Sequence, residues 1–255
     1  MMRLAVAILV AAAGIALAAD IPPAQRRSGF EFMGAETQAM QRDDALNPAM
    51  LWVAEGEALW NEAPAGAKSC VQCHGAAGAT MRGVAARYPA FDDRAGRPVD
   101  LQQRINLCRT AHQDQPAFAP ESAPLLALAA YLGLQSRGLP LAPPQDVRLD
   151  VHRERGRTLF ATPMGQLDFS CVQCHDDNWG KRLAGSPIPQ AHPTGYPIYR
   201  LEWQGLGSLQ RRLRNCMTGV RAEPYDYGAP EFIDLELYLA ARAAGMAVET
   251  PGVRP

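Results

Sequence analysis

Apolar side chains recur at helical spacing in two segments that each stop near a glycine. The first spans residues 125–134 and is followed by Gly138. Residues 231–244 show the same pattern and are followed by Gly245. A shorter, strongly basic segment at 209–216 predicts a third helix or turn. No apolar–polar alternation exceeds four residues, so the sequence predicts a mainly α fold without long strands.

The first apolar run has the form of an export signal. The chain begins with a positively charged Met-Met-Arg, residues 4–17 are apolar, and small residues follow. This order predicts a signal peptide at 1–18, cleaved after Ala18. An uncleaved anchor helix is the alternative, although the run is shorter than the ~20 residues that span a bilayer. No second run of that length follows, so we expect a periplasmic protein with no membrane span after cleavage.

The chain contains one pentapeptide twice. Cys70-Val71-Gln72-Cys73-His74 recurs letter for letter as Cys171-Val172-Gln173-Cys174-His175. The similarity continues downstream, because a Tyr-Pro pair begins 20 residues before Cys108 in one copy and 20 residues before Cys216 in the other. The two segments with helical periodicity also align with each other. The sequence therefore predicts two tandem duplicated domains.

Composition and charge refine this organisation. Gly and Pro are frequent, with 22 and 21 residues, whereas aromatic residues make up 7%, which favours short helices joined by long loops. The Pro-rich run at 138–144 is the natural linker. We expect an N-terminal extension at 19–50, a first domain at 51–142 and a second at 143–255. The formal net charge of −1 leaves no basic excess, so we expect no nucleic-acid partner.

Cys-x-x-Cys-His is the attachment motif of c-type haem. Its two thiols add to the haem vinyl groups, and the following histidine reaches the iron. A redox dithiol is the first alternative, but no βαβ pattern accompanies the motif. A zinc site is the second, but the histidine after each copy would then be a coincidence. We expect two covalently bound c-type haems, attached through Cys70, Cys73, Cys171 and Cys174 and ligated by His74 and His175.

Several residues could ligate each haem iron on the side opposite the motif histidine. Methionine and histidine are the usual choices in electron carriers. The candidates are Met81, Met164, Met217, Met246, His112, His152 and His192. None of them recurs at equivalent positions, whereas Cys108 and Cys216 do, so we favour cysteine ligation. A Cys108–Cys216 disulfide is the alternative, and His112 competes for the first haem.

Basic residues gather around only one of these two cysteines. Arg212 lies one helical turn before Cys216 and shares its face. The other basic residues nearby are Arg211, Arg214, Arg221, Lys181 and Arg182. A solvated helix face is the simpler interpretation. Beside a thiol that faces haem iron we favour an oxyanion site, because arginine forms forked bonds to oxyanions. This combination indicates sulfur chemistry, with a persulfide on Cys216 as the transferable form.

Three segments of the second domain resemble the SoxA family. They lie at 178–185, 196–203 and 216–225, and the resemblance covers essentially the whole mature chain. It implies a dihaem subunit of a SoxAX-type L-cysteine S-thiosulfotransferase, which joins thiosulfate to a cysteine of the SoxYZ carrier protein. Electrons would pass through haem to SoxX, a monohaem cytochrome that forms a heterodimer with this subunit.

The resemblance also implies roles for single residues. The second domain would hold the active site, with His175 and a persulfidated Cys216 as iron ligands. Arg212 would bind thiosulfate, and Lys181 is a weaker candidate for the same pocket. The first haem would be ligated by His74 and Cys108. Two other functions remain open: a simple dihaem electron-transfer cytochrome, and a thiosulfate dehydrogenase that forms tetrathionate.

Overall fold

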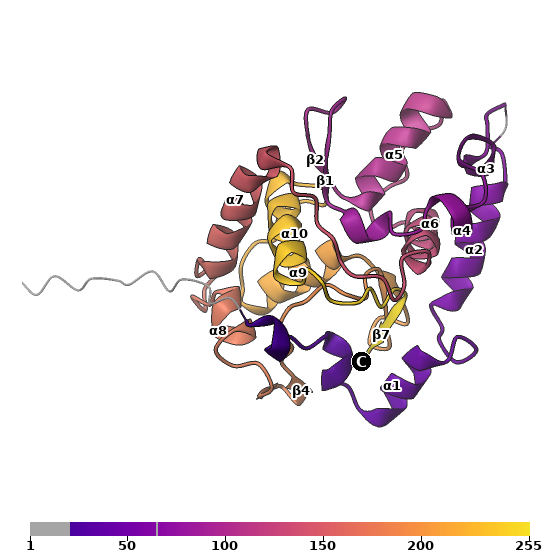
Figure 1. The fold of residues 1–255 in the computed structure, drawn as a ribbon. Coiled ribbons are helices and arrows are strands. Elements are labelled where there is room, and N and C mark those ends of the chain that lie inside the picture. The colour runs from indigo at the N-terminus through magenta and orange to yellow at the C-terminus, as the bar shows by residue number, and fades with distance from the viewer. Residues whose placement is uncertain (1–20, 65) are drawn as a thin grey trace, which may run out of the picture.

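The protein is a helix-rich chain in which two similar units lie side by side (Figure 1). The structure, a computed structural model, describes residues 21–64 and 66–255. The expected signal peptide at 1–18 lies outside the described residues. The prediction of a mainly helical fold with two tandem units is confirmed, and the helices are short, as the glycine and proline content suggests.

Helices of the N-terminal extension and of the first unit come first along the chain. They are α1 (Ala35–Arg42), α2 (Met50–Asn61), α3 (Cys70–His74), α4 (Ala77–Thr80), α5 (Leu101–His112) and α6 (Ala123–Leu134). The helices of the second unit are α7 (Asp150–Ala161), α8 (Cys171–His175), α9 (Leu209–Gly219) and α10 (Pro230–Arg242). Single 3-10 turns lie at Pro23–Gln25, Gly29–Phe32, Ala85–Arg87 and Val147–Leu149.

The three helices predicted from the sequence correspond to α6, α10 and α9. The third extends beyond its expected end at Cys216 and stops at Gly219. Met217 explains the extra turn, because its buried side chain joins the apolar cluster of the second unit. Ser208 begins the helix, since its side chain accepts a hydrogen bond from the backbone N–H of Arg211.

One helix crossing forms the centre of each unit. In the first unit α2 crosses α6 at Gly56, where an added Cβ would clash with the carbonyl oxygen of Ala127. In the second unit α7 crosses α10 at Gly156, where an added Cβ would clash with the carbonyl oxygen of Asp234. Figure 1 shows the second pair, α7 and α10, packed along one side of the molecule. Glycine is required at both crossings because the two backbones touch.

Strands are few and at most three residues long. The strands are β1 (Ala90–Asp92), β2 (Arg97–Val99), β3 (Arg182–Leu183), β4 (Ser186–Pro187), β5 (Ile198–Arg200), β6 (Gly205–Gly207) and β7 (Gly252–Arg254). β1 pairs with β2 and β5 pairs with β6 as antiparallel hairpins, each directly before a helix, α5 or α9. β7 adds to β5 in parallel. A short hairpin therefore leads into the cysteine-bearing helix in both units.

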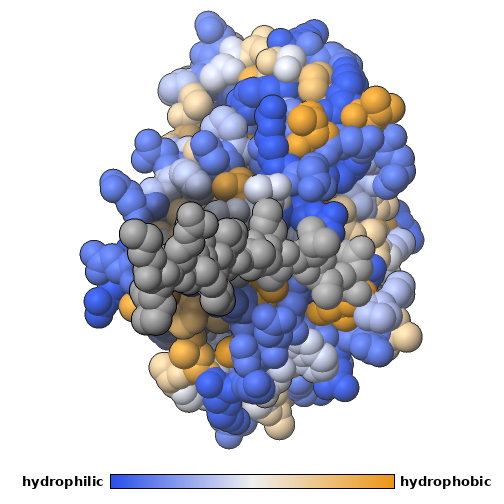
Figure 2. Space-filling model, turned by 90° about the vertical axis from the view of Figure 1, so that its left-hand side faces the viewer, coloured by the Kyte–Doolittle hydropathy of each residue, from blue (hydrophilic) through white to orange (hydrophobic). Residues whose placement is uncertain are grey.

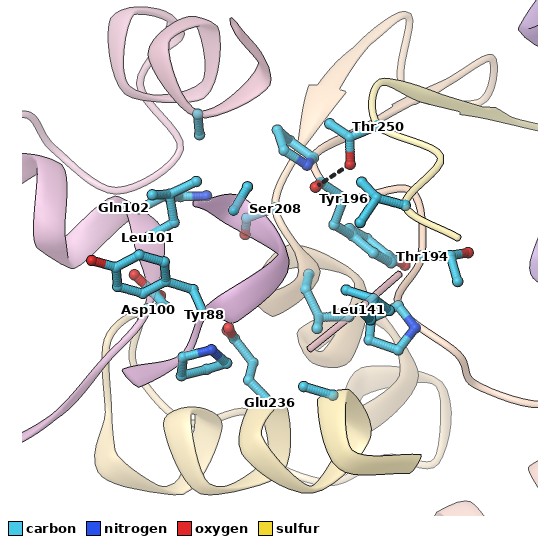
Figure 3. A pocket seen from close by; sticks show the side chains of 18 residues that line it. Tyr88, Asp100, Leu101, Gln102, Leu141, Thr194, Tyr196, Ser208, Glu236 and Thr250 are labelled. Atoms are coloured by element: carbon cyan, nitrogen blue, oxygen red, sulfur yellow. Dashed lines mark hydrogen bonds between the residues drawn. The ribbon is translucent and has the colours of Figure 1, made fainter. Parts of the chain in front are cut away.

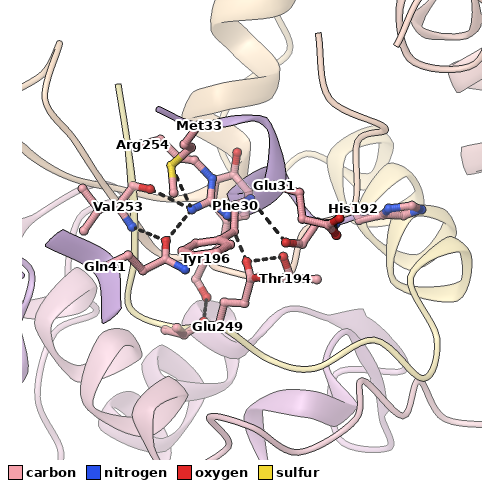
Figure 4. Close-up of polar contacts among 12 residues, drawn as sticks. Phe30, Glu31, Met33, Gln41, His192, Thr194, Tyr196, Glu249, Val253 and Arg254 are labelled. Atoms are coloured by element: carbon pink, nitrogen blue, oxygen red, sulfur yellow. Dashed lines mark hydrogen bonds and ion pairs between the residues drawn. The ribbon is translucent and has the colours of Figure 1, made fainter. Parts of the chain in front are cut away.

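The N-terminal extension contacts both units. Asp44 forms a two-bond ion pair with Arg137 of the first unit at 2.6 and 2.8 Å. Near the C-terminus, the Gln41 side chain accepts a hydrogen bond from the backbone N–H of Val253 at 2.9 Å, and Arg254 bonds to the same oxygen (Figure 4). Because β7 also pairs with β5, the extension is linked to the hairpin that precedes α9.

A small cavity of about 110 Å³ with a mixed polar and apolar lining lies where the two units meet. Figure 3 shows Tyr88 and Asp100 of the first unit facing Tyr196 and Glu236 of the second across it. The Gln210 amide donates hydrogen bonds to Asp100 and to Glu236, both at 2.9 Å. Burial raises the pKa of Asp100 to about 6 and raises the pKa of Glu236 well above its ordinary value, the latter further through Asp100.

The surface is mostly hydrophilic on the face in Figure 2, where apolar residues form small separate groups. The large apolar side chains that are most exposed are Leu46, Leu51, Val147, Val151, Leu167, Phe169 and Leu183. Within the described part of the chain, no helix has the length and apolar character that a bilayer span requires.

Candidate functional site

Each Cys-x-x-Cys-His motif folds as one helical turn that is capped in the same way. The hydroxyl of Ser69 accepts a bond from the backbone N–H of Gln72, and the Gln72 side chain accepts from the backbone N–H of Ser69. Ser170 and Gln173 form the same reciprocal pair. This is a capping box, and it fixes the start of the turn that carries both thiols. The Ser-x-x-Gln pattern was readable from the sequence, but our sequence analysis did not use it.

The histidine of the second motif is half-buried and held in one orientation. Its Nδ1 donates a hydrogen bond to the carbonyl oxygen of Pro189 at 2.6 Å. Burial lowers the pKa of His175 to about 4, and the nearby Arg212 and Arg242 act in the same direction. The imidazole is therefore neutral, and its Nε2 keeps a lone pair for a metal. The ring lies 6.4 Å from the ring of Phe160, centroid to centroid.

The histidine of the first motif faces an open cavity of about 920 Å³. His74 is exposed, and its ring lies 5.7 Å from that of Trp60. The cavity is lined by the motif side chains and by apolar residues of three helices, α2, α5 and α6: Cys70, Cys73, His74, Leu59, Trp60, Leu101, Ile105, Leu128 and Leu132. A volume of this order with a mostly apolar lining is typical of a cofactor site.

The helices α5 and α9 bring their cysteines to the two motifs. Cys108 lines the first cavity, and its charge contributes to the raised pKa of Cys70, which burial causes first. In the second unit, burial raises the pKa of Cys171 to about 12, and Cys216 is the next cause. Cys216 also raises the pKa of Cys174, after burial. All six cysteines are free thiols in the structure, so the alternative Cys108–Cys216 disulfide is not formed.

The other candidate iron ligands are distributed unevenly. Met81 and His112 line the first cavity together with Cys108. Met164 and Met217 belong to the apolar cluster of the second unit. The remaining three lie elsewhere: Met246 packs in a separate cluster, His152 bonds to Asp234 at 2.6 Å, and His192 bonds to the carbonyl oxygen of Arg27 at 2.8 Å.

Only one of the basic residues predicted near Cys216 is shown to interact with it. The Cys216 thiolate raises the pKa of Arg212, which is half-buried one turn earlier on α9. Arg211 lies over the ring of Trp203 at 4.3 Å, and Arg214 bonds to the carbonyl oxygen of Tyr225. The weaker candidate Lys181 is exposed and donates to the side chain of Asn178 at 2.7 Å. Within the basic segment, Arg211 and Arg214 thus bind other groups. Arg212 is the arginine that interacts with the Cys216 thiol.

A second arginine near Cys216 escaped the sequence analysis. Arg200 is the last residue of β5, and its side chain is 13% exposed. Burial lowers the pKa of Arg200, and Arg212 lowers it further, whereas Glu202, Tyr196 and Cys216 raise it. Arg200 lies inside the segment 196–203 that carries the family resemblance. Its distance along the chain from Cys216 gave no sign of its position, because the hairpin β5–β6 folds it back toward α9.

The residues of both motifs fit a c-type haem. Each motif offers two thiols and one imidazole on a capped turn, against an apolar wall. In the first unit the wall is the cavity lining described above. In the second unit it is the cluster of Phe160, Val172, Met217, Leu235 and Tyr238. The neutral His175 with its Nδ1 bound to a carbonyl is the donor state that an iron ligand needs.

Two helical units, each with a Cys-x-x-Cys-His turn against an apolar core, define a c-type cytochrome. The chain belongs to the SoxA family, since the model described as SoxA/TsdA, cytochrome c domain, matches residues 55–141 and 155–248. The family predicted from the sequence is thereby confirmed. Membership also favours c-type haem over the zinc and dithiol interpretations.

Known relatives cover most of the chain. Two proteins named L-cysteine S-thiosulfotransferase subunit SoxA, from Rhodovulum sulfidophilum and Pseudaminobacter salicylatoxidans, are 36% and 37% identical to it over 230 residues. These matches span 89% of this chain and 80% of each relative. A chain in the crystal structure of SoxXA from P. pantotrophus matches with a TM-score of 0.86 at 32% identity, over 90% of this chain and 87% of that chain.

Proposed function

We propose that this chain is a periplasmic dihaem subunit that joins thiosulfate oxidatively to a cysteine of a SoxYZ-like carrier protein. The names of its relatives as L-cysteine S-thiosulfotransferase subunits support the activity. The likeness to a chain of SoxXA supports a heterodimer with a SoxX-like monohaem cytochrome. The observation that carries the proposal is the electrostatic contact between Arg212 and Cys216 beside the second motif.

The proposal assigns the haem-binding residues from the geometry of each unit. In the first unit the thioether bonds would form at Cys70 and Cys73, with His74 and Cys108 as iron ligands. In the second unit Cys171 and Cys174 would attach the haem, and its iron ligands would be His175 and Cys216. A haem held there supplies, when bound, the one-electron redox centre of the site.

The reaction divides into two balanced steps at Cys216. In the first, the Cys216 thiolate and the outer sulfur of thiosulfate form an S–S bond, and two electrons leave toward the SoxX-like cytochrome. In the second, the carrier thiolate attacks that outer sulfur and forms a new S–S bond. The bond to Cys216 breaks, and the Cys216 thiolate is regenerated. The carrier cysteine ends as a thiosulfonate, and its proton is released to solvent.

Arg212 performs the electrostatic part of both steps. Its guanidinium offers forked N–H donors to the sulfonate oxygens, which places the outer sulfur toward Cys216 one turn away. Three anionic groups meet in this site: thiosulfate, the Cys216 thiolate and the carrier thiolate. A fixed cation in a half-buried position reduces their mutual repulsion. His175 keeps its proton on Nδ1, which donates to the carbonyl oxygen of Pro189, and takes no part in proton transfer.

The decisive experiment is thiosulfate-dependent cytochrome reduction by the holoprotein with its SoxX-like partner and a SoxYZ-like carrier. We expect Arg212→Gln to lower kcat/KM for thiosulfate by ~100-fold or more, which corresponds to a buried charge-assisted contact. Arg104→Gln is the matched control, because Arg104 aligns with Arg212 in the first unit. The control should change kcat/KM by less than ~3-fold, since Arg104 is paired with Asp92 in the first unit, away from Cys216.

Product analysis separates the rival functions. The transferase requires the carrier and adds one thiosulfonate group to its cysteine, visible in the intact mass of the carrier. A thiosulfate dehydrogenase would form tetrathionate without any carrier. A simple electron-transfer cytochrome would show neither product, and Arg212→Gln would then leave its electron-transfer rate unchanged.

A further inference from the structure

The segment from the Tyr-Pro pair to the ligand-helix cysteine has the same length in both units. β1 and β5 begin two residues after Tyr88 and Tyr196, respectively. The pairing register is also the same, with Asp92 opposite Arg97 in one hairpin and Arg200 opposite Gly205 in the other. Asp92 and Arg200 therefore occupy one structural position, as the last residue of the first hairpin strand.

This position carries opposite charges in the two units. In the first unit Asp92 lies 2.6 Å from Arg104 of α5, carboxylate oxygen to guanidinium nitrogen, and Asp92 is buried. Arg104 is the equivalent of Arg212, because each lies four residues before its helix cysteine. The first unit thus neutralises its ligand-helix arginine with an internal carboxylate. The second unit places Arg200 where that carboxylate would be.

The guanidinium of Arg212 has no carboxylate partner of this kind. Among the described residues it forms no ion pair and no side-chain hydrogen bond, and the groups that raise its pKa are Cys216, Tyr196 and Glu202. Arg200 is held in place from its other side: its Nη2 lies 2.7 Å from a carboxylate oxygen of Glu202, and its Nε donates to the carbonyl oxygen of Pro255 at 2.9 Å. Glu202 is 60% exposed, so water weakens its effect on the arginine pair.

We propose that Arg200 is a second anion-binding residue, which together with Arg212 holds the sulfonate end of a tetrahedral dianion beside Cys216. The inference rests on the proposed function for the identity of its substrate. Two neighbouring guanidinium groups match a doubly charged oxyanion, because each forms forked bonds to a separate pair of oxygens. A bound dianion relieves the mutual repulsion of the two arginines. Asp92 closes the corresponding position of the first unit to anions.

Sulfate is the probe of choice, because it carries the same tetrahedral oxyanion geometry and is inert to redox turnover. Calorimetric titration of the oxidised holoprotein should give one sulfate per chain. Arg200→Asp, which recreates the charge pattern of the first unit, should weaken sulfate binding by at least ~100-fold. Arg200→Gln should weaken it by ~10-fold, and Arg200→Lys by less than Arg200→Gln. Arg211→Gln is the matched control and should stay within ~2-fold, because Arg211 stacks on Trp203.

Sulfate affinity that is the same in Arg200→Gln and in the wild type would overturn the inference, provided the absorption spectrum of the second haem is unchanged. Thiosulfate kinetics give a second readout: Arg200→Gln should raise KM by ~10-fold and leave kcat within ~3-fold, since Arg200 binds the end that does not react. Cys216→Ser separates the two claims. It should abolish transfer to the carrier but keep Arg200-dependent sulfate binding.

Discussion

The two units of this protein share a scaffold but differ in what surrounds their ligand helices. Gly56 and Gly156 permit the same helix crossing, and the same capping box starts each haem motif. In the first unit the ligand-helix arginine is paired with Asp92, and the motif histidine is exposed. In the second unit the arginine has a cationic neighbour, and the motif histidine is half-buried. Duplication supplied two sites that fit a haem, and the charge at one hairpin position differs between them.

The largest effect should come from the pair of cysteines. Cys216→Ser is expected to lower carrier-dependent turnover by ~1,000-fold or more, because in the proposed function Cys216 is both the sulfur acceptor and an iron ligand. Cys108→Ser is expected to change turnover by less than ~3-fold, while the absorption spectrum of the first haem changes. Both rates follow from cytochrome reduction with thiosulfate and carrier. Equal losses in the two variants would contradict the division of roles between the units.

A second comparison concerns the shared helix crossing. Gly156→Ala and Gly56→Ala each force a methyl group into a backbone carbonyl of the partner helix. We expect either substitution to lower the free energy of unfolding by about 3 kcal/mol, at the upper end of overpacking effects. Denaturant titration of the holoprotein measures this directly. Gly34→Ala is the control, because a methyl group there meets no other atom within 4 Å.

If only one of the two crossing variants is destabilised, the two helix crossings are not equivalent. If both variants lose stability but keep the wild-type KM for thiosulfate, the helix crossing serves folding alone. The functional difference between the units would then come from the charges near α5 and α9.

The third comparison uses pH and the carboxyl groups between the units. The raised pKa of Asp100 means that the native state retains a proton which the unfolded state releases above pH 3.8. Stability therefore falls as pH rises from about 4 to about 6. Because the pKa of Glu236 is also raised, the loss of stability continues to higher pH. Asp100→Asn should flatten this dependence in thermal or urea unfolding, and asparagine still caps α5.

The matched control for this variant is Asp146→Asn. Arg148 lowers the pKa of the exposed Asp146 to about 2, so its removal should not flatten the loss of stability between pH 4 and pH 7. A pH profile of Asp100→Asn that is as steep as that of the wild type would show that Asp100 is charged throughout this range.

The sequence alone was sufficient for three of the helices and for the positions of the two motifs, but not for the contacts between distant segments. The periodic segments gave α6 and α10, and the repeated pentapeptide located both motifs, because these features depend on neighbouring residues. Arg200 and Asp92 were missed, since their importance depends on a hairpin that brings them to arginines twelve residues further along the chain. The Pro189 carbonyl that binds His175 was missed for the same reason: a backbone acceptor has no sequence signature.

The smallest predicted effect concerns how the N-terminal extension supports the second motif. The carbonyl of Pro189 holds His175, and the next residues are held by the extension: Gln190 accepts a bond from the backbone N–H of Arg27 at 2.7 Å, and His192 donates to the carbonyl oxygen of Arg27. The extension therefore stabilises the loop that orients the histidine. His74 has no bond of this kind among the described residues, so the first haem serves as an internal reference.

His192→Leu should loosen this loop and weaken the bond from His175 to the carbonyl, which lowers the basicity of the imidazole. A less basic ligand stabilises ferric iron less, so the reduction potential of the second haem should rise. The expected rise is less than the ~59 mV that corresponds to a tenfold change in the ratio of oxidised to reduced haem. Spectroelectrochemical titration resolves both haems in one sample. His192→Asn retains a donor toward Arg27 and should restore the potential; an equal shift of both haems would instead indicate a general loosening of the fold.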